Sequence, residues 1–126
     1  MHYHFGLADS GDQDMSVSDS RGNSPLAGRH ILIVEDETII RSALRRLLER
    51  NQYEVSEAGS VQEAQERFSI PSFDLIVSDL RLPGAPGTEL IKLGQGTPLL
   101  IMTSYASLRS AVDSMKMGAV DYIAKP

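Results

Sequence analysis

The chain has 126 residues, which is enough for one domain with a buried core and too few for two. Its formal net charge of −5 at pH 7 argues against direct binding to nucleic acid or to an anionic membrane surface, since both depend on clustered Lys and Arg. The sequence contains no Cys, which excludes disulfides and Cys nucleophiles and fits the cytoplasmic location that we expect. The apolar runs are too short to predict a signal peptide or a membrane span.

The N-terminal segment, residues 1–29, differs in composition from the rest of the chain. It is rich in Ser, Asp and Gly and shows neither a helical nor an alternating apolar pattern. This composition is typical of a disordered tail, so we expect the folded domain to occupy residues 30–126.

The first part of that domain predicts two strand–helix units. Ile31–Val34 reads as a strand buried on both faces, and apolar residues then recur at helical spacing from Asp36 to Asn51. A second strand is predicted over residues 53–58, and a capping box from Ser60 to Glu63 opens a helix that ends near residue 68. The first helix carries four arginines that we interpret as a solvated face, namely Arg41, Arg45, Arg46 and Arg50.

The second part continues the alternation. A strand, a short helix, a strand, a longer helix and a last strand are predicted at residues 73–78, 88–93, 98–102, 108–117 and 120–124. Ser107 is the expected N-cap of the longer helix, and Gly118 is its expected C-terminal stop. Its inner face should carry Leu108, Ala111, Val112 and Met115. The whole pattern predicts an open, doubly wound α/β fold with a parallel sheet.

Polar side chains stand at the C-terminal ends of four predicted strands. They are Glu35 and Asp36 after the first strand, Asp79 after the third, Thr103 after the fourth and Lys125 after the last. These side chains should meet, because the carboxyl ends of parallel strands lie along one edge of a sheet. Three adjacent carboxylates repel by roughly 4 kcal/mol per pair, so we expect a cation, and a few hard oxygen ligands with room for water favour Mg²⁺.

This residue set indicates phosphoryl transfer onto a carboxylate. Asp79 is the candidate nucleophile, since an ionised carboxylate needs no general base to attack phosphorus. Asp36 and Asp79 are the preferred direct metal ligands, whereas Glu37 is expected in the first helical turn, where a negative charge is favourable. Lys125 and a Thr103 hydroxyl would contact the transferred phosphoryl oxygens, although alone they could be a surface charge and a strand-end residue.

Residues 30–126 closely resemble the receiver domain of bacterial two-component response regulators. The motifs that carry the resemblance are Ile31 to Glu37, Asp74 to Pro83 with Gly87, Ile101 to Thr103, and Asp121 to Pro126. The resemblance implies a flavodoxin-like five-stranded sheet of order 2-1-3-4-5. The family's fifth helix is missing from this chain, so we expect the natural protein to continue, with an effector domain of a transcription-regulating type.

The resemblance also implies roles for individual residues. Asp79 would be the phospho-acceptor, which takes its phosphoryl group from a sensor histidine kinase or phosphotransfer protein and loses it by slow autodephosphorylation, with no enzymatic turnover of other substrates. The Mg²⁺ ligands would be Glu35, Asp36, Asp79 and the backbone carbonyl of Arg81. Thr103 and Tyr122 would form a switch pair, although Tyr122 could equally be a packing residue. A partner or a homodimer would use the face of the fourth helix and fifth strand, and the kinase would dock on the first helix.

Three other function classes are alternatives, and the residues count against each of them. A Mg²⁺-dependent phosphatase with an Asp nucleophile would resemble a pattern with a second Asp two residues later, where this chain has Arg81. A nucleotide- or flavin-binding module would need a Gly-rich phosphate loop after a strand, and the sequence has none. A receiver-like interaction module that is never phosphorylated is disfavoured by the intact acidic, hydroxyl and ammonium groups.

Overall fold

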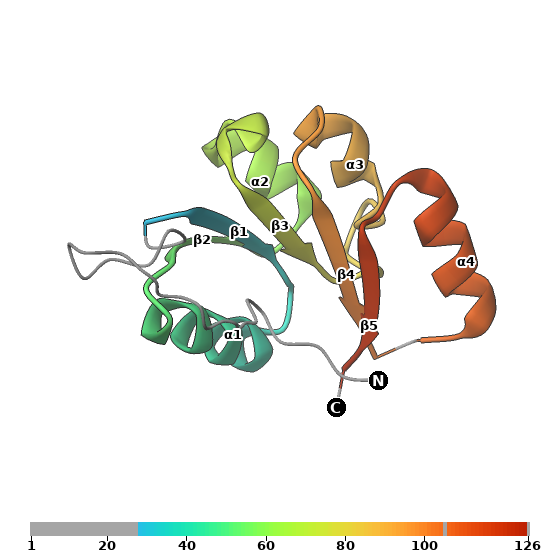
Figure 1. The fold of residues 1–126 in the computed structure, drawn as a ribbon, viewed down its shortest axis with the longest axis horizontal. Coiled ribbons are helices and arrows are strands. Elements are labelled where there is room, and N and C mark those ends of the chain that lie inside the picture. Colours follow the sequence, from blue (N-terminus) through green and yellow to red (C-terminus); the bar gives the residue numbers. More distant parts are fainter. Residues whose placement is uncertain (1–27, 105, 126) are drawn as a thin grey trace, which may run out of the picture.

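The computed structural model describes residues 28–104 and 106–125, apart from the side chain of Leu108. Five parallel strands form one sheet in the order β2-β1-β3-β4-β5, which confirms the predicted topology (Figure 1). The strands are β1 (His30–Val34), β2 (Glu54–Ala58), β3 (Leu75–Ser78), β4 (Leu99–Thr103) and β5 (Asp121–Ala124). The helices are α1 (Thr38–Arg50), α2 (Val61–Arg67), α3 (Glu89–Gly94) and α4 (Leu108–Met117), with a short 3₁₀ helix η2 (Ile70–Ser72).

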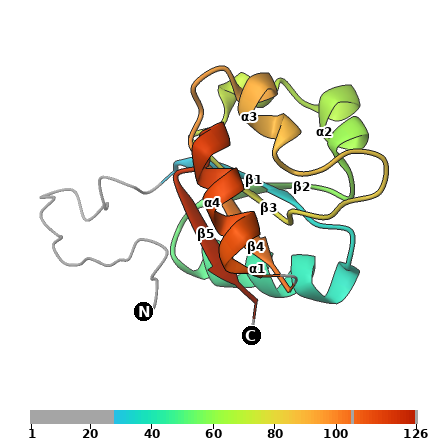
Figure 2. The ribbon, with the colours of Figure 1, turned by 90° about the vertical axis from the view of Figure 1, so that its right-hand side faces the viewer.

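Helices lie on both faces of the sheet. Helix α1 covers one face, α2 and α3 cover the other, and α4 runs alongside β5 (Figures 1 and 2). Alternate strand residues therefore enter two cores: Leu32 and Ile76 pack toward α2 and α3, while Ile33 and Val77 pack toward α1. Burial on both faces explains why the inner strands β1, β3 and β4 read as nearly continuous apolar runs rather than alternating ones.

The predicted helix ends are set by local chemistry. Ser60 Oγ accepts a hydrogen bond from the Glu63 N–H at 3.0 Å, as a capping box requires. The Glu63 carboxylate accepts from the Gly59 N–H at 2.6 Å, one residue before the N–H that this motif usually uses. Ser107 Oγ caps α4, and Gly118 ends it with a φ of 120°, a left-handed conformation that favours glycine.

Two local predictions are wrong. Helix α1 begins at Thr38, so Glu37 is its N-cap residue and does not lie in the first turn. Val112 and Met115, expected on the inner face of α4, are 42% and 45% exposed, whereas Ser114 is buried. Helix α4 packs mainly on β5, an edge strand, which is too narrow to cover the whole apolar stripe of the helix.

The remaining predicted boundaries agree with the observed ones to within two residues, and those of α4 coincide. The tail predicted for residues 1–29 lies outside the described residues, apart from Gly28 and Arg29. Those two residues pair with the chain at and just before β2: the Gly28 N–H donates to the Gln52 carbonyl, and the Glu54 N–H donates to the Arg29 carbonyl. Within the described part of the chain, the helices are too short and too polar to cross a bilayer.

Candidate functional site at the carboxyl edge of the sheet

Three carboxylates meet at the carboxyl edge of the sheet. Glu35 directly follows β1, Asp36 is the next residue, and Asp79 directly follows β3. Each offers one oxygen, and these oxygens lie within 4.8 Å of one another. Glu35 and Asp79 are 2% and 5% exposed, whereas Asp36 faces solvent. The structure thus brings together the acidic residues that the strand-end pattern singled out.

Lys125 joins this cluster from the end of β5. Its ammonium donates to Glu35 Oε1 at 2.6 Å and to Asp79 Oδ2 at 3.2 Å. The Glu37 carboxylate is 3.8 Å from the same nitrogen. The Lys125 side chain is only 4% exposed, so it is not a surface charge. Its backbone N–H donates to the Thr103 carbonyl at 2.8 Å, which holds the residue after β5 against β4.

Burial governs the ionisation of this cluster. It raises the pKa of Glu35 above its ordinary value, and the Lys125 ammonium and the Glu37 amide only partly offset that rise. Burial alone would lower the pKa of Lys125, but hydrogen bonds and charge from Glu35 and Asp79 together outweigh it and raise this pKa. The lysine therefore stays protonated, and it is one ammonium beside three carboxyl groups.

The other predicted site residues take different positions. Thr103 ends β4 and is fully buried, next to the strand that carries Asp79. The Arg81 N–H lies 3.4 Å from Asp79 Oδ1, in the loop after β3. Tyr122 is half-buried in β5, and its hydroxyl contacts Ser110 Oγ on α4. The Tyr122 hydroxyl is thus directed toward α4.

Gly87 makes a close backbone contact with Asp79. Ser78 Oγ donates to the Asp79 carbonyl at 2.8 Å. Gly87 comes so near that a Cβ on it would lie 2.0 Å from the same carbonyl oxygen. The Gly87 N–H donates to the Leu80 carbonyl at 2.9 Å, which folds the loop back onto the end of β3. The Pro- and Gly-rich sequence predicts a turn here, but it does not reveal this contact.

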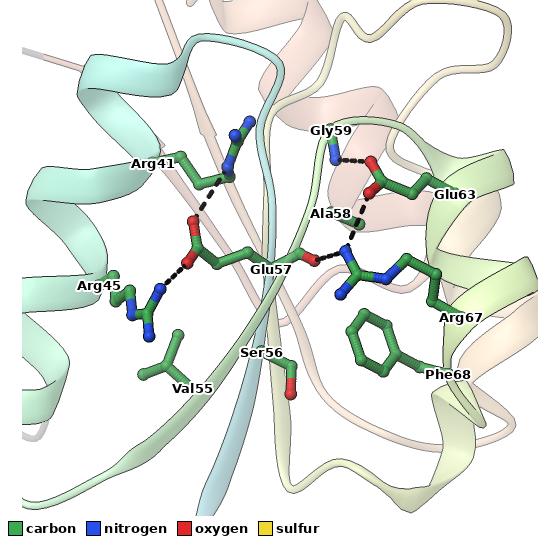
Figure 3. A pocket seen from close by; sticks show the side chains of 10 residues that line it. All are labelled: Arg41, Arg45, Val55, Ser56, Glu57, Ala58, Gly59, Glu63, Arg67 and Phe68. Atoms are coloured by element: carbon green, nitrogen blue, oxygen red, sulfur yellow. Dashed lines mark hydrogen bonds and ion pairs between the residues drawn. The ribbon is translucent and has the colours of Figure 1, made fainter.

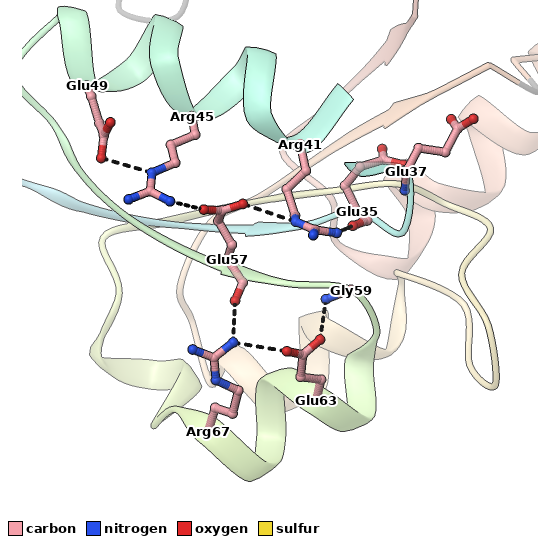
Figure 4. A network of polar contacts seen from close by, with 9 residues as sticks. All are labelled: Glu35, Glu37, Arg41, Arg45, Glu49, Glu57, Gly59, Glu63 and Arg67. Carbon is pink, nitrogen blue, oxygen red and sulfur yellow. Dashed lines mark hydrogen bonds and ion pairs between the residues drawn. The ribbon is translucent and has the colours of Figure 1, made fainter. Parts of the chain in front are cut away.

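Sequence reasoning also missed the role of Arg41. Its Nη1 donates to the backbone carbonyl of Glu35 at 2.7 Å, and its Nε donates to Glu57 Oε1 at 3.0 Å (Figure 4). The interpretation as a solvated face is wrong for Arg41, whose side chain is 21% exposed. It holds for the exposed Arg46 and Arg50. No local pattern reveals the contact, because Glu57 is 16 residues away on β2.

A pocket of about 380 Å³ lies beside β2, between α1 and α2 (Figure 3). It is lined by charged side chains, namely Arg41, Arg45, Glu57, Glu63 and Arg67, together with Phe68 and residues 55, 56, 58 and 59. These charges pair with one another across the pocket. None of the three clustered carboxylates lines it, so the chemistry of the strand ends lies outside this pocket.

Comparisons with known proteins agree with this architecture. The family model of the response regulator receiver domain matches residues 31–126. Response regulator protein PilR of Pseudomonas aeruginosa is 38% identical over 99 residues, which are 75% of this chain and 22% of PilR. Transcriptional regulatory protein FixJ of Bradyrhizobium diazoefficiens is 36% identical over 101 residues, which are 77% of this chain and 49% of FixJ. The chain thus spans half or less of the length of these two relatives.

Solved structures give the same result. A response regulator from Burkholderia pseudomallei, determined with a phosphorylated aspartic acid, calcium ion and citrate, has a TM-score of 0.70 and 33% identity, covering 78% of this chain and 60% of that one. A CheY-like receiver domain protein from Methanospirillum hungatei has a TM-score of 0.70 and 38% identity, covering 79% and 83%. Fold, family model and relatives agree, and this chain belongs to the receiver-domain family of two-component response regulators.

Proposed function

We propose that Asp79 is the phospho-acceptor of this receiver domain and that its phosphoryl donor is a sensor histidine kinase or a phosphotransfer protein. The observation that carries the proposal is the buried Asp79 carboxylate, held 3.2 Å from the Lys125 ammonium beside two further acids. An acceptor needs an ionised oxygen, and a transferred phosphoryl group needs positive charge around it. At this position the Asp79 carboxylate would supply the attacking oxygen and Lys125 the positive charge.

Mg²⁺ is the metal that this donor set fits best. Glu35, Asp36 and Asp79 supply hard oxygens within 4.8 Å of one another, and the exposure of Asp36 leaves room for water ligands. The backbone carbonyl of Arg81 would complete the protein ligands. When bound, Mg²⁺ would neutralise the carboxylates and the phosphoryl oxygens around it.

The protein's own residues would then carry the transfer. An Asp79 carboxylate oxygen forms a bond to phosphorus as the bond from phosphorus to the donor imidazole nitrogen breaks, and the electron pair leaves with the imidazole. The Lys125 ammonium, already at the site, holds a phosphoryl oxygen, and Thr103 donates a hydrogen bond to another. Slow attack of water on phosphorus would later break the bond between phosphorus and the Asp79 oxygen, releasing inorganic phosphate and restoring the carboxylate, so the chain would transfer a signal and turn over no other substrate.

The phosphorylated state would alter the face formed by α4 and β5. In this proposal Thr103 moves toward the phosphoryl group and Tyr122 turns inward. Exposed apolar residues on this face support its use by a partner or by a second copy of the chain, since Val112, Met115 and Val120 are 42%, 45% and 55% exposed.

The proposal includes the setting of the domain. Residues 30–126 would form the receiver domain, with residues 1–29 as a tail outside it, in the cytoplasm. The relative FixJ is named as a transcriptional regulatory protein, so transcription is the output that we propose. With a net charge of −5, this chain itself would bind neither nucleic acid nor membrane.

Acetyl phosphate, a small-molecule donor, tests the acceptor directly. With Mg²⁺ it should add one acid-labile phosphoryl group, which intact-mass spectrometry detects. Asp79→Asn should abolish the addition, whereas Asp113→Asn, which alters an exposed carboxylate on α4, should leave it unchanged. Label on the Asp79→Asn variant would exclude Asp79 as the acceptor. No label on the wild-type protein would support the alternative of a receiver-like module that is not phosphorylated.

A further inference from the structure

A charged network around Glu57 joins three elements of the fold. The Glu57 carboxylate on β2 accepts hydrogen bonds from two guanidinium groups of α1, those of Arg41 and Arg45 (Figure 4). Arg45 also donates to Glu49 at 3.1 Å, one turn farther along α1. On the other side, the Glu57 backbone carbonyl accepts from Arg67 of α2 at 3.3 Å. The network therefore fixes the position of α1 and α2 relative to β2.

Arg41 differs from Arg45 in one contact that leads to the acidic cluster. Its Nη1 donates to the Glu35 carbonyl at 2.7 Å, while the carboxylate of that same Glu35 accepts from Lys125. The Glu35 N–H donates to the Ala58 carbonyl at 3.0 Å. The Glu35 N–H is thus held by β2, whereas the Glu35 carbonyl is held by the Arg41 side chain.

The contact is of a kind that holds a backbone firmly. A guanidinium that donates to a carbonyl makes a charge-assisted hydrogen bond, which is stronger than a neutral one. The Arg41 and Glu57 side chains are 21% and 22% exposed, so water competes weakly for this guanidinium. The Glu57 carboxylate supplies the counter-charge that a half-buried Arg needs.

We propose that Arg41, held in place by Glu57, is a positioning residue for the metal site. It fixes the main chain at Glu35, and so the direction in which the Glu35 and Asp36 carboxylates leave the turn after β1. It touches neither the metal nor the substrate. The inference rests on the proposed function, since it takes the acidic cluster to be a Mg²⁺ site. Loss of such an indirect contact typically weakens metal binding by roughly 10-fold or more.

The paired variants Arg41→Gln and Arg45→Gln test the proposal. Both remove a guanidinium from Glu57, but only the first also frees the Glu35 carbonyl. Calorimetric titration should show a Mg²⁺ dissociation constant raised roughly 10-fold in Arg41→Gln and within about twofold of wild type in Arg45→Gln. Arg41→Lys, which keeps one charged donor, should recover part of the affinity. Glu57→Gln should give a smaller rise than Arg41→Gln.

A second measurement needs no metal. The Glu37 N–H donates to Glu35 Oε2 at 3.0 Å, so its hydrogen exchange reports on the geometry of the turn. In the metal-free protein, Arg41→Gln should speed this exchange roughly fivefold, the factor that one lost hydrogen bond represents, and Arg45→Gln should not. Equal shifts in both variants, or no shift in Arg41→Gln, would overturn the proposal. A wild-type protein that binds no Mg²⁺ would refute the metal site instead, and the exchange rates would still decide the role of Arg41.

Discussion

The contact between Gly87 and Asp79 predicts that one added methyl group will damage both stability and phosphorylation. In Gly87→Ala, the new Cβ would lie 2.0 Å from the Asp79 carbonyl oxygen and 2.6 Å from Ser78 Oγ. Real Cβ atoms do not approach other atoms closer than 3.0 Å, so the backbone on one side must move by about 1 Å. The atom that must yield belongs to the main chain of the proposed phospho-acceptor.

The size of both effects follows from this displacement. Overpacking of a tightly packed site costs about 1–3 kcal/mol, and backbone atoms, which yield least, place this variant near the upper end. The hydrogen bond from Ser78 Oγ to the Asp79 carbonyl, now 2.8 Å, would be lost and add about 1 kcal/mol. A misplacement of about 1 Å at a reacting group can slow a reaction by roughly 100-fold. We therefore expect the free energy of unfolding to fall by about 4 kcal/mol and the phosphorylation rate to fall by roughly 100-fold.

Urea unfolding followed by circular dichroism gives the free energy of unfolding, and the rate of phosphorylation by acetyl phosphate gives the functional effect. Gly84→Ala is the matched control, because Gly84 has a φ of +86° but nothing within 4 Å of its Cβ position. It should cost about 1 kcal/mol through backbone strain and leave the rate unchanged. The reasoning is refuted if Gly87→Ala is no less stable than Gly84→Ala, or if it keeps the wild-type rate.

Two further predictions concern charge. Lys125→Met leaves the buried Glu35 and Asp79 without their cation, so the free energy of unfolding at pH 7 should fall by about 3–5 kcal/mol. Because burial raises the pKa of Glu35, this carboxyl group takes up a proton in the folded protein as pH falls, and the loss of stability in Lys125→Met should then shrink. A loss that urea unfolding shows to be independent of pH would contradict this prediction. The Gly59 N–H and then Arg67 lower the pKa of Glu63 below its ordinary value of 4.5. The Glu63 carboxylate therefore adds to the free energy of unfolding above pH 4.5, and this gain is lost as pH falls through the lowered pKa. At pH 7, Glu63→Gln should be less stable than wild type by under about 1 kcal/mol, since solvent screens this exposed group. In acid, the stability of the variant should approach that of wild type.

The parts of the fold that could be predicted from the sequence are those with local causes. The run Ile31–Val34 has no polar face, so it had to be a strand covered on both sides. The Ser60 and Ser107 caps satisfy backbone N–H groups within three residues, and Gly118 adopts a conformation that favours glycine. Each of these signals involves residues adjacent in sequence, and each is confirmed.

The phase of α4 and the contact of Arg41 have causes that are distant in sequence. The apolar residues of α4 predict an inner face, but where the sheet ends decides how much of that face is covered, and Val112 stays exposed. Likewise, nothing near Arg41 distinguishes it from Arg46 on the same helix. The difference comes from Glu57, which β1–β2 pairing brings within reach, and pairing is a property of the whole sheet.

The acidic site could be foreseen although its members are also distant in sequence. Glu35 and Lys125 are 90 residues apart, yet both lie at the same edge of the sheet because β1 and β5 run parallel in it, and the long Lys125 side chain spans the two strands between them. Side-chain direction adds a second requirement, which topology does not supply. The Glu35 carboxylate must project from its turn toward Lys125. The backbone that carries the carboxylates is constrained by two contacts, that of Arg41 with the Glu35 carbonyl and that of Gly87 with the Asp79 carbonyl. Strand order therefore accounts for which residues meet, and these non-local contacts account for how they are oriented when they do.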